Sequence, residues 1–362
     1  MNRGNGVNLP VVRGHNEALL LGLLRDAGPG GLGRADLAGR TGLTPQAVSK
    51  ITARLTAEGL VAEAGRGAST GGKPRTLLRL VPEARSAVGV QLDRDELTAV
   101  RVDLAGRVVA RWSGPLDFAA GPAAAVEAVL RAVVRVREAG GSGAPLLGVG
   151  VAAPGPLDWR DGVLGRVTGF PEWEGFPLRE VLAGRLGAGV PVVVDKDTNA
   201  GVAATAMAAT AEADGRGANC VYVHVGTGVG AGLRLDGAVF RGPRSLAGEF
   251  GHQVLELDGP PCRCGGRGCV EALCLSALAR GDLAGAARVL GEGAANVVAL
   301  LDVERVVLGG RVVEAEPGVF AEGVGAVLVR RAGAGVAVAV AGAGVAEGAA
   351  ELVLGPVFGR GV

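Results

Sequence analysis

The sequence predicts an α/β protein in which a winged helix-turn-helix domain of α+β structure, residues 1–82, precedes a larger α/β body. The first of three observations is charge. Residues 1–82 carry 11 Lys and Arg against 5 Asp and Glu, whereas the rest of the chain carries 26 against 31. The second is a run of helical patterns in this basic part, followed by a charged hairpin pattern. The third is a series of short apolar strands in the body, which end in glycine-rich or polar loops and alternate with helices.

Bulk composition limits the class of protein. A length of 362 residues is enough for two or three domains. A basic head on a slightly acidic body favours a polyanionic partner for the head alone. The sequence has neither a secretory signal pattern nor a clear membrane-spanning run, and four of its five cysteines fall between 262 and 274. We therefore expect a reduced, cytoplasmic protein with a metal site and no membrane partner.

Three helices are expected in the head. Asn16 is a suitable N-cap for a helix at about 17–26, and a second short helix is expected at about 34–40. Thr44 caps the third helix, and Gly59 follows its end. The tight turn between the second and third helices is typical of a helix-turn-helix unit.

The third helix is the predicted recognition helix. Val48, Ile51 and Leu55 fall on one face, so the polar side chains of this helix lie largely on the other. Strands at 60–63 and 76–81 form a wing whose basic tip faces phosphates. The predicted DNA contacts are Thr44, Gln46, Ser49, Lys50, Arg54, Arg66, Lys73 and Arg75. The alternative is a small helical domain with a solvated polar face.

The body is predicted from its alternation of strands and helices. The expected strands are 87–92, 97–103, 108–113, 146–151, 191–194, 220–225, 232–235 and 305–308. Helices are expected at 122–139, after Asn199 to about 213, and near 275–301, and the chain ends in a further strand and helix. Ligand sites in such proteins lie at the carboxyl ends of the strands.

A cysteine-rich loop at 248–271 predicts a metal site. Three thiols and one imidazole can close a tetrahedral site around zinc, and the loop's glycines permit the tight turns that this needs. The predicted ligands of a structural Zn²⁺ are His252, Cys262, Cys264 and Cys269. Glu249 and Glu271 flank them, so a bound metal fixes where these carboxylates point. The alternative is a set of buried or incidental cysteines.

With these motifs the chain resembles the ROK family of repressors, open reading frames and sugar kinases, in its repressor branch. The resemblance covers about residues 12–355. It rests on the cysteine loop and on Gly-Val-Ala-Ala-Pro-Gly-Pro-Leu-Asp at 150–158, Asp-Lys-Asp-Thr-Asn-Ala at 195–200, Gly-Thr-Gly-Val-Gly at 226–230 and Gly-Glu-Phe-Gly-His at 248–252. It implies an actin-like, ribonuclease H-like body whose lobes, 83–194 and 195–362, hold a sugar between them. It also implies that the C-terminal helix returns to the first lobe, and that the protein forms homodimers or homotetramers.

The resemblance also implies a set of sugar ligands. Carried over by position, they are Gly155, Asp197, Glu249, His252 and Glu271, with Lys196 where the sugar kinases usually carry Asn. Ionised carboxylates are strong acceptors for sugar hydroxyls. His252 is expected to bind zinc through one ring nitrogen and a sugar hydroxyl through the other. Asp197 stands at the position of the kinases' general base.

The departures from the family's kinases favour a sensor. Asp93-Arg94-Asp95-Glu96-Leu97 stands where the kinases carry a glycine-rich phosphate loop, and its carboxylates would repel a phosphate. We therefore expect no catalytic residue, and a sugar-responsive repressor of carbohydrate metabolism genes. Its expected partners are operator DNA and a small sugar or sugar phosphate. The alternatives are an active ATP-dependent sugar kinase and a sugar-independent architectural or protein-interaction module.

Overall fold

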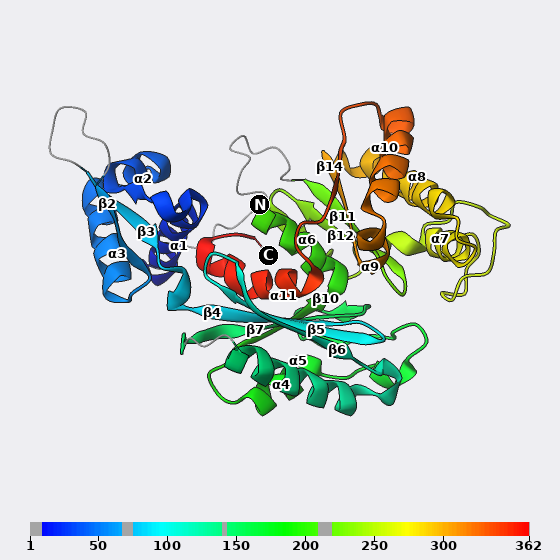
Figure 1. Cartoon of the computed structure of the whole chain (residues 1–362), viewed down its shortest axis with the longest axis horizontal. Coiled ribbons are helices and arrows are strands. Elements are labelled where there is room, and N and C mark those ends of the chain that lie inside the picture. The colour runs from blue at the N-terminus through cyan, green and yellow to red at the C-terminus, as the bar shows by residue number, and fades with distance from the viewer. Residues whose placement is uncertain (1–8, 67–74, 140–142, 209–218, 362) are drawn as a thin grey trace, which may run out of the picture.

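The structure is a computed structural model that describes residues 9–66, 75–139, 143–208 and 219–361. Figure 1 shows an elongated molecule with a small head at one end and a body built on two large sheets, each of five strands. The C-terminal helix lies within the body, against the first sheet, and the turn that follows it contacts the first helix of the head.

The head combines helices with a small sheet, the arrangement of a winged helix-turn-helix. Its elements are α1 (Leu9–Ala27), β1 (Leu32–Gly33), α2 (Arg34–Thr41), α3 (Pro45–Ala57), β2 (Val61–Arg66) and β3 (Thr76–Leu80), with strand order β1-β3-β2. Leu24, Leu37, Val48 and Leu55 are buried in its core.

The start of the first helix differs from the prediction. The helix α1 begins at Leu9, so Asn16 lies inside it and is not its N-cap. Pro10 stands in the first turn of this helix, where the missing N–H of a proline costs nothing, so the helix starts before Asn16. The cap predicted for α3 is confirmed, because Oγ1 of Thr44 accepts a hydrogen bond of 3.2 Å from the backbone N of Ala47.

The first body sheet has the strand order β10-β7-β4-β5-β6. The strands are β4 (Ser86–Leu92), β5 (Glu96–Asp103), β6 (Val108–Pro115), β7 (Leu146–Ala153) and β10 (Val192–Lys196). Helices α4 (Pro122–Ala139) and α5 (Leu178–Leu186) cover one face, and α11 (Val345–Leu354) covers the other (Figure 1). A Cβ at Gly89 or Gly150 would lie within 2 Å of a carbonyl oxygen of α11, so these glycines let the helix backbone approach the sheet.

The second body sheet has the strand order β13-β12-β11-β14-β15. Its strands are β11 (Cys220–Val225), β12 (Val229–Leu235), β13 (Ala238–Phe240), β14 (Arg305–Gly309) and β15 (Ala337–Val340). The helices of this part are α6 (Asp197–Ala208), α7 (Val270–Ala279), α8 (Leu283–Leu301), α9 (Arg311–Ala315) and α10 (Pro317–Ala332). Helix α6 packs between β12 and α11, and a Cβ at Gly232 would lie 2.0 Å from the carbonyl oxygen of Thr198.

Several boundaries in the body differ from their predicted places by two or three residues, as at the end of β7, the end of β6 and the start of β12. The strand expected at 191–194 continues to Lys196, and α6 begins at Asp197, so the Asp195–Asn199 motif straddles a strand end and a helix start. The expected end of that helix near 213 lies outside the described residues. Helices α5, α9 and α10 were not predicted.

One described helix, α8, has the length and composition of a membrane span, with a mean hydropathy of 1.2 over its best window. This is weak evidence, because the same window is 44% buried inside the protein. Leu290 and Ala294 of α8 are buried in the core of the second sheet, as in a core helix.

Candidate sugar and metal sites

All six residues predicted to bind sugar line one pocket, which opens at the carboxyl ends of several strands. They are Gly155, Lys196, Asp197, Glu249, His252 and Glu271. Gly155 follows β7, Lys196 ends β10, and the 226–230 turn joins β11 to β12. Residues far apart in the sequence therefore meet because the strands that precede them end at the same cleft.

Lys196 is held by two oxygen atoms at the pocket wall. Its ammonium donates to Oε1 of Glu249 at 3.0 Å and to the carbonyl oxygen of Ala247 at 2.9 Å. The side chain of Lys196 is 5% exposed, and that of Glu249 is 44% exposed. A Cβ at Gly155 would lie 2.8 Å from Cδ of Lys196, so the lysine stem needs a glycine opposite it.

Asp195 anchors the base of the pocket instead of facing into it. Its Oδ1 accepts from Nδ2 of Asn199 at 2.7 Å, and its Oδ2 accepts from Nε of Arg241 at 2.7 Å. The Arg241 guanidinium also lies over the ring of Trp159, 4.4 Å from its centroid. This buried network fixes the junction of β10 and α6, and no local sequence pattern connected Arg241 or Trp159 to it.

Asp197 begins α6 and faces the cleft. Its Oδ1 accepts a hydrogen bond of 2.7 Å from the backbone N of Thr198. Burial raises the pKa of Asp197 above its ordinary value of 3.8, and the nearby His224 and Lys196 oppose this rise. His224 lines the same pocket, with its Nδ1 3.1 Å from the hydroxyl of Tyr222. His224 was not among the predicted site residues, because it is a single histidine in an apolar strand.

Glu271 ties the glycine turn to the first turn of α7. Its Oε2 accepts from the backbone N of Val229 at 3.0 Å. A Cβ at Gly228 would lie 2.9 Å from the same Oε2, which explains why a glycine stands there.

The four predicted metal ligands come together. Their ligand atoms all lie within 4.8 Å of one another, so His252, Cys262, Cys264 and Cys269 can hold a metal ion. Sγ of Cys262 lies 3.8 Å from Nδ1 of His252, and the Sγ atoms of Cys264 and Cys269 lie 3.8 Å apart. His252 also lines the pocket of the predicted sugar ligands, so it joins the two candidate sites.

The turn at 93–97 makes contacts across the cleft to the second sheet. Oδ1 of Asp93 accepts from Oγ1 of Thr227 at 3.0 Å. Nη1 of Arg311 donates to both carboxylate oxygens of Asp95, at 3.0 and 2.8 Å. Arg94, between these two carboxylates, lines the pocket.

Comparison with known proteins settles the family. The chain matches the model of the ROK family over residues 88–282, more than half of its length. The protein belongs to the ROK family. The predicted family is thus confirmed.

Curated relatives of this ROK protein include transcriptional repressors. It is 25% identical to the xylose repressor of Bacillus spizizenii over 259 residues, which cover 71% of this chain and 64% of that protein. It is 30% identical to the DNA-binding transcriptional dual regulator NagC of Escherichia coli over 280 residues, covering 75% of this chain and 64% of that protein. The chain therefore spans about 64% of the length of these relatives.

Solved ROK structures confirm the predicted fold. A ROK family transcriptional regulator, a homolog of the E. coli MLC protein, superposes with a TM-score of 0.77 and 19% identity over 96% of this chain and 97% of that chain. A ROK hexokinase from Thermus thermophilus superposes with a TM-score of 0.58 and 29% identity over 74% of this chain and 98% of the hexokinase. The body therefore has the actin-like fold, and a ROK regulator shares the fold of head and body together.

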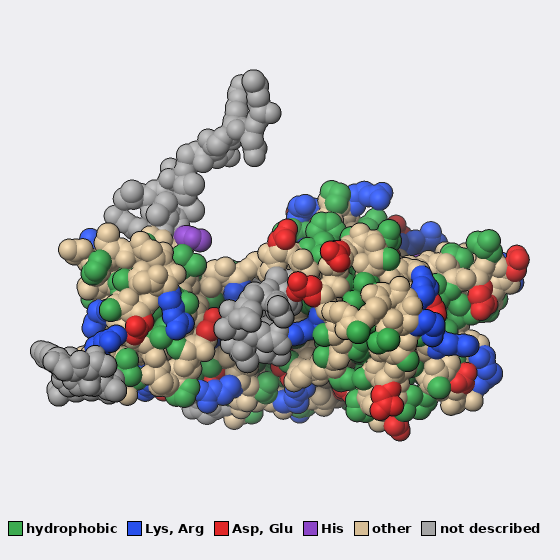
Figure 2. Space-filling model, turned by 90° about the horizontal axis from the view of Figure 1, so that it is seen from above, with side chains coloured by type: hydrophobic (Ala, Val, Ile, Leu, Met, Phe, Trp, Pro, Cys, Tyr) green, Lys and Arg blue, Asp and Glu red, His purple; other side chains and the backbone are tan. Residues whose placement is uncertain are grey.

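The head of this ROK protein exposes part of the predicted DNA-contact set. Gln46, Ser49 and Lys50 are exposed on α3. Of the other predicted contacts, the hydroxyl of Thr44 caps α3 and Arg54 is paired with Glu17. Arg75 is exposed, and its Nη1 lies 3.6 Å from Asp36. The side chain of Arg66 and the whole of Lys73 lie outside the part of the chain that the structure describes. On the face seen in Figure 2, basic side chains on the head stand beside a few acidic ones, and the body also carries both kinds.

Proposed function

We propose that this ROK protein is a sugar-responsive, DNA-binding transcriptional regulator that represses carbohydrate metabolism genes in the cytoplasm. The observation that carries the proposal is a winged helix-turn-helix head joined to a cleft that is lined by all six residues predicted to bind sugar. The relatives named as xylose repressor and NagC support the same class of function.

The head supplies the DNA contacts. Gln46, Ser49 and Lys50 of α3 enter the major groove, and Arg66, Lys73 and Arg75 of the wing contact phosphates. A homodimer, alone or within a homotetramer, places two α3 helices on half-sites of a palindrome about one helical turn apart. Residues 1–82 act as the DNA-binding domain, and the lobes 83–194 and 195–362 bind the sugar.

The cleft binds the effector through hydroxyl groups. Glu249, Glu271 and Asp197 accept hydrogen bonds from sugar hydroxyls, because ionised carboxylates are strong acceptors. Lys196 adds a donor, so a ligand at Glu249 meets a paired carboxylate and not a free one. Gly155 leaves room for the lysine stem beside the ligand.

The metal in the cysteine cluster is zinc in this proposal. Zn–S bonds of about 2.3 Å in a tetrahedron place two sulfur atoms about 3.8 Å apart, which is the distance between the Sγ atoms of Cys264 and Cys269. Zinc supplies rigidity here and takes no part in chemistry. His252 turns Nδ1 towards the thiols, which leaves its Nε2 for a sugar hydroxyl.

Repression requires that the sugar favour one arrangement of the heads over another. To shift the populations of two conformations from 1:99 to 99:1, the sugar must bind one conformation about 10⁴-fold more tightly than the other, a difference of about 5.5 kcal/mol in binding free energy. Helix α6, which begins at the pocket and packs on α11, offers a rigid connection to the head side of the body.

An ATP-dependent sugar kinase is the second candidate. Asp197 at the general-base position and the likeness to ROK kinases favour it. Against it, the turn at 93–97, which stands where the kinases carry a glycine-rich phosphate loop, has no glycine to bring backbone N–H groups up to a triphosphate, and its Asp93 and Asp95 are already paired with Thr227 and Arg311. We propose that the cleft binds sugar without phosphorylating it.

Three measurements on the full chain separate these candidates. A binding series across fragments of the source genome should reveal a preferred sequence, and a sugar panel should change the affinity for it. A coupled ADP-release assay with the same sugars and ATP·Mg should give no turnover. Sequence-independent DNA binding would contradict the regulator, and steady turnover would establish the kinase.

A further inference from the structure

Two cations line the sugar pocket, and only one of them has a carboxylate partner. Lys196 is paired with Glu249. The guanidinium of Arg94 is half-buried, and among the described residues no carboxylate lies within ion-pair distance of it. The guanidinium lies over the ring of Phe170, 5.7 Å from its centroid. Nearby arginines differ, since Arg311 pairs with Asp95 and Arg241 pairs with Asp195.

The backbone holds Arg94 in place. Its N donates to Oδ1 of Asp93 at 2.7 Å, and its carbonyl oxygen accepts from the N of Phe118 at 3.2 Å. Nη2 of Arg94 lies 4.0 Å from the position that a Cβ would take at Gly228, so the guanidinium reaches towards the glycine turn. The carboxylates beside it are already engaged, because Asp93 accepts from Thr227 and Asp95 pairs with Arg311, so the repulsion of a phosphate expected from the sequence is reduced. A half-buried cation that is held between them without an ion-pair partner of its own is suited to a ligand anion.

We propose that the effector is an anionic sugar, whose phosphate or carboxylate binds Arg94 beside the glycine turn at 226–230. The hydroxyls of its ring then face Glu249, His252 and Glu271 at the other side of the same pocket. The planar guanidinium matches a phosphate or carboxylate with two parallel hydrogen bonds. This inference rests on the proposed function, since it names the chemical class of the ligand for the same site.

Calorimetry on the full chain tests this with three related ligands: a hexose, its 6-phosphate and the corresponding uronic acid. The wild type should bind one anionic form about 10- to 100-fold more tightly than the neutral hexose. Arg94→Gln should remove this preference while keeping the affinity for the neutral hexose. Arg131→Gln, on the exposed surface of α4, is the matched control and should behave as the wild type.

The outcomes separate the ligand class from the function. The two anionic ligands distinguish a phosphorylated from an oxidised sugar, and inorganic phosphate alone measures the contribution of the anion. Equal binding of neutral and anionic hexoses, or an unchanged preference in Arg94→Gln, overturns the anionic effector and leaves the sugar sensor intact. If no sugar in a broad panel binds or alters DNA affinity, both proposals fail.

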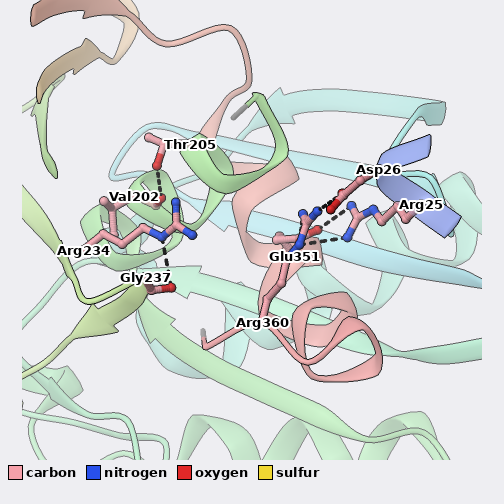
Figure 3. Close-up of polar contacts among 8 residues, drawn as sticks. All are labelled: Arg25, Asp26, Val202, Thr205, Arg234, Gly237, Glu351 and Arg360. Carbon is pink, nitrogen blue, oxygen red and sulfur yellow. Dashed lines mark hydrogen bonds and ion pairs between the residues drawn. The ribbon is translucent and has the colours of Figure 1, made fainter. Parts of the chain in front are cut away.

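A different observation concerns the junction of head and body. Arg25 of α1 makes two parallel hydrogen bonds to Glu351 of α11, at 3.0 and 2.8 Å, with side-chain exposures of 3% and 0%. Arg360 joins the same network, with Nη1 3.5 Å from Glu351 and Nη2 donating to Asp26 at 2.6 Å. Figure 3 shows these four side chains pointing towards one another from the head helix and the C-terminal segment.

Close packing surrounds this charge cluster. The Arg25 guanidinium lies over the ring of Phe358, 4.5 Å from its centroid. A Cβ at Gly22 would lie 2.9 Å from the carbonyl oxygen of Phe358, so α1 rests directly on the C-terminal turn. A buried pair of this kind is sensitive to small shifts, because loss of either partner leaves an uncompensated charge.

Helix α11 connects this cluster to the sugar pocket. A Cβ at Gly348 of α11 would lie 1.8 Å from the carbonyl oxygen of Ala200 in α6, so the two helices touch at their backbones. The first residues of α6, Asp197 and Thr198, line the pocket. We infer that the Arg25–Glu351 pair couples ligand binding in the cleft to the orientation of the head.

The test is the ligand-induced change in operator affinity of a paired replacement. Arg25→Met with Glu351→Met removes both charges and keeps similar volume, which often preserves stability. This variant should still bind ligand and DNA, but the ligand-induced change in DNA affinity should fall towards onefold. The control is Arg111→Met with Glu347→Met, which removes another ion pair of α11 that does not reach the head. The control should keep the wild-type change.

Arg25→Lys provides a second route if the paired replacement does not fold. It keeps the charge but loses the two parallel hydrogen bonds, so it should weaken the ligand effect with little loss of stability. An undiminished ligand effect in a folded Arg25 variant overturns the coupling role. Absence of a ligand effect in the wild type instead contradicts the proposed function.

Discussion

Removal of either partner of the Lys196–Glu249 pair should have unequal effects on stability. The lysine side chain is 5% exposed, and the glutamate side chain is 44% exposed. Glu249→Ala leaves a buried ammonium with the Ala247 carbonyl as its partner among the described residues. Lys196→Met leaves a carboxylate that water can reach, and keeps the stem packed on Gly155.

The magnitudes follow from this asymmetry. Glu249→Ala should lower the free energy of unfolding by about 2–3 kcal/mol, less than for a fully buried pair because Glu249 is half-exposed. Lys196→Met should lower it by about 1 kcal/mol or less, since the lost hydrogen bond to Ala247 is offset by no longer burying a charge. At about 2–4 °C per kcal/mol, the Tm should fall by about 4–12 °C for Glu249→Ala and by at most about 4 °C for Lys196→Met.

Thermal and urea denaturation followed by circular dichroism measure these changes. Glu249→Gln is the matched control, because its amide oxygen still accepts from the ammonium, and it should cost about 1 kcal/mol. The reasoning is refuted if Lys196→Met is as destabilising as Glu249→Ala, or if Glu249→Ala leaves the Tm unchanged.

Three further predictions concern charge, metal and DNA. Because burial raises the pKa of Asp197, the folded state holds its proton more tightly than the unfolded chain, and stability is lost as pH rises above 3.8 through the raised pKa. Asp197→Asn should therefore have a higher Tm than the wild type at pH 7–8, and this difference in Tm should shrink towards pH 4. A difference in Tm that grows on acidification would contradict the raised pKa of Asp197. Cys264→Ser should remove zinc and lower the Tm, whereas Cys274→Ala should keep the metal; native mass spectrometry decides, and retained zinc in Cys264→Ser would refute the ligand assignment. Arg75→Ala should weaken binding to all DNA sequences alike and lower the salt slope by about one, while Arg107→Ala in the body leaves both unchanged; an altered sequence preference would contradict a phosphate contact.

Local patterns were enough to predict the parts of the fold that depend on neighbouring residues. The helix at 122–139 has the predicted bounds, and Thr44 caps α3 as its sequence position indicates. The metal cluster was also predictable, since Cys262, Cys264 and Cys269 fall close together and His252 precedes them by ten residues. In each case the chemistry is contained in one short segment.

Glycine obscured the helices that the sequence analysis missed. The segment at 311–332 contains Gly318, Gly323 and Gly325, which lower intrinsic helix propensity. Tertiary packing outweighs this cost, because a Cβ at Gly323 would lie 2.6 Å from Cβ of Ala287, so the glycine lets α10 and α8 approach closely. Intrinsic helix propensity alone does not predict that contact between two helices.

Ion pairs between residues far apart in the sequence could not be predicted from local sequence patterns. Arg25 and Glu351 are 326 positions apart, and Arg241 and Asp195 are 46 positions apart. Each arginine is one of many in an arginine-rich chain, and only the fold determines which carboxylate it meets. The pairing of Lys196 with Glu249, which changes how a sugar can be held, arose in the same way.

The most direct test of the account is a thermodynamic cycle on the full chain. Operator affinity is measured with and without saturating effector, and effector affinity is measured with and without saturating operator. The account predicts that both affinities change, and by the same factor, because coupling between two sites is reciprocal. A factor of one in both directions would mean that the cleft and the head act independently, and would contradict a regulator that senses sugar.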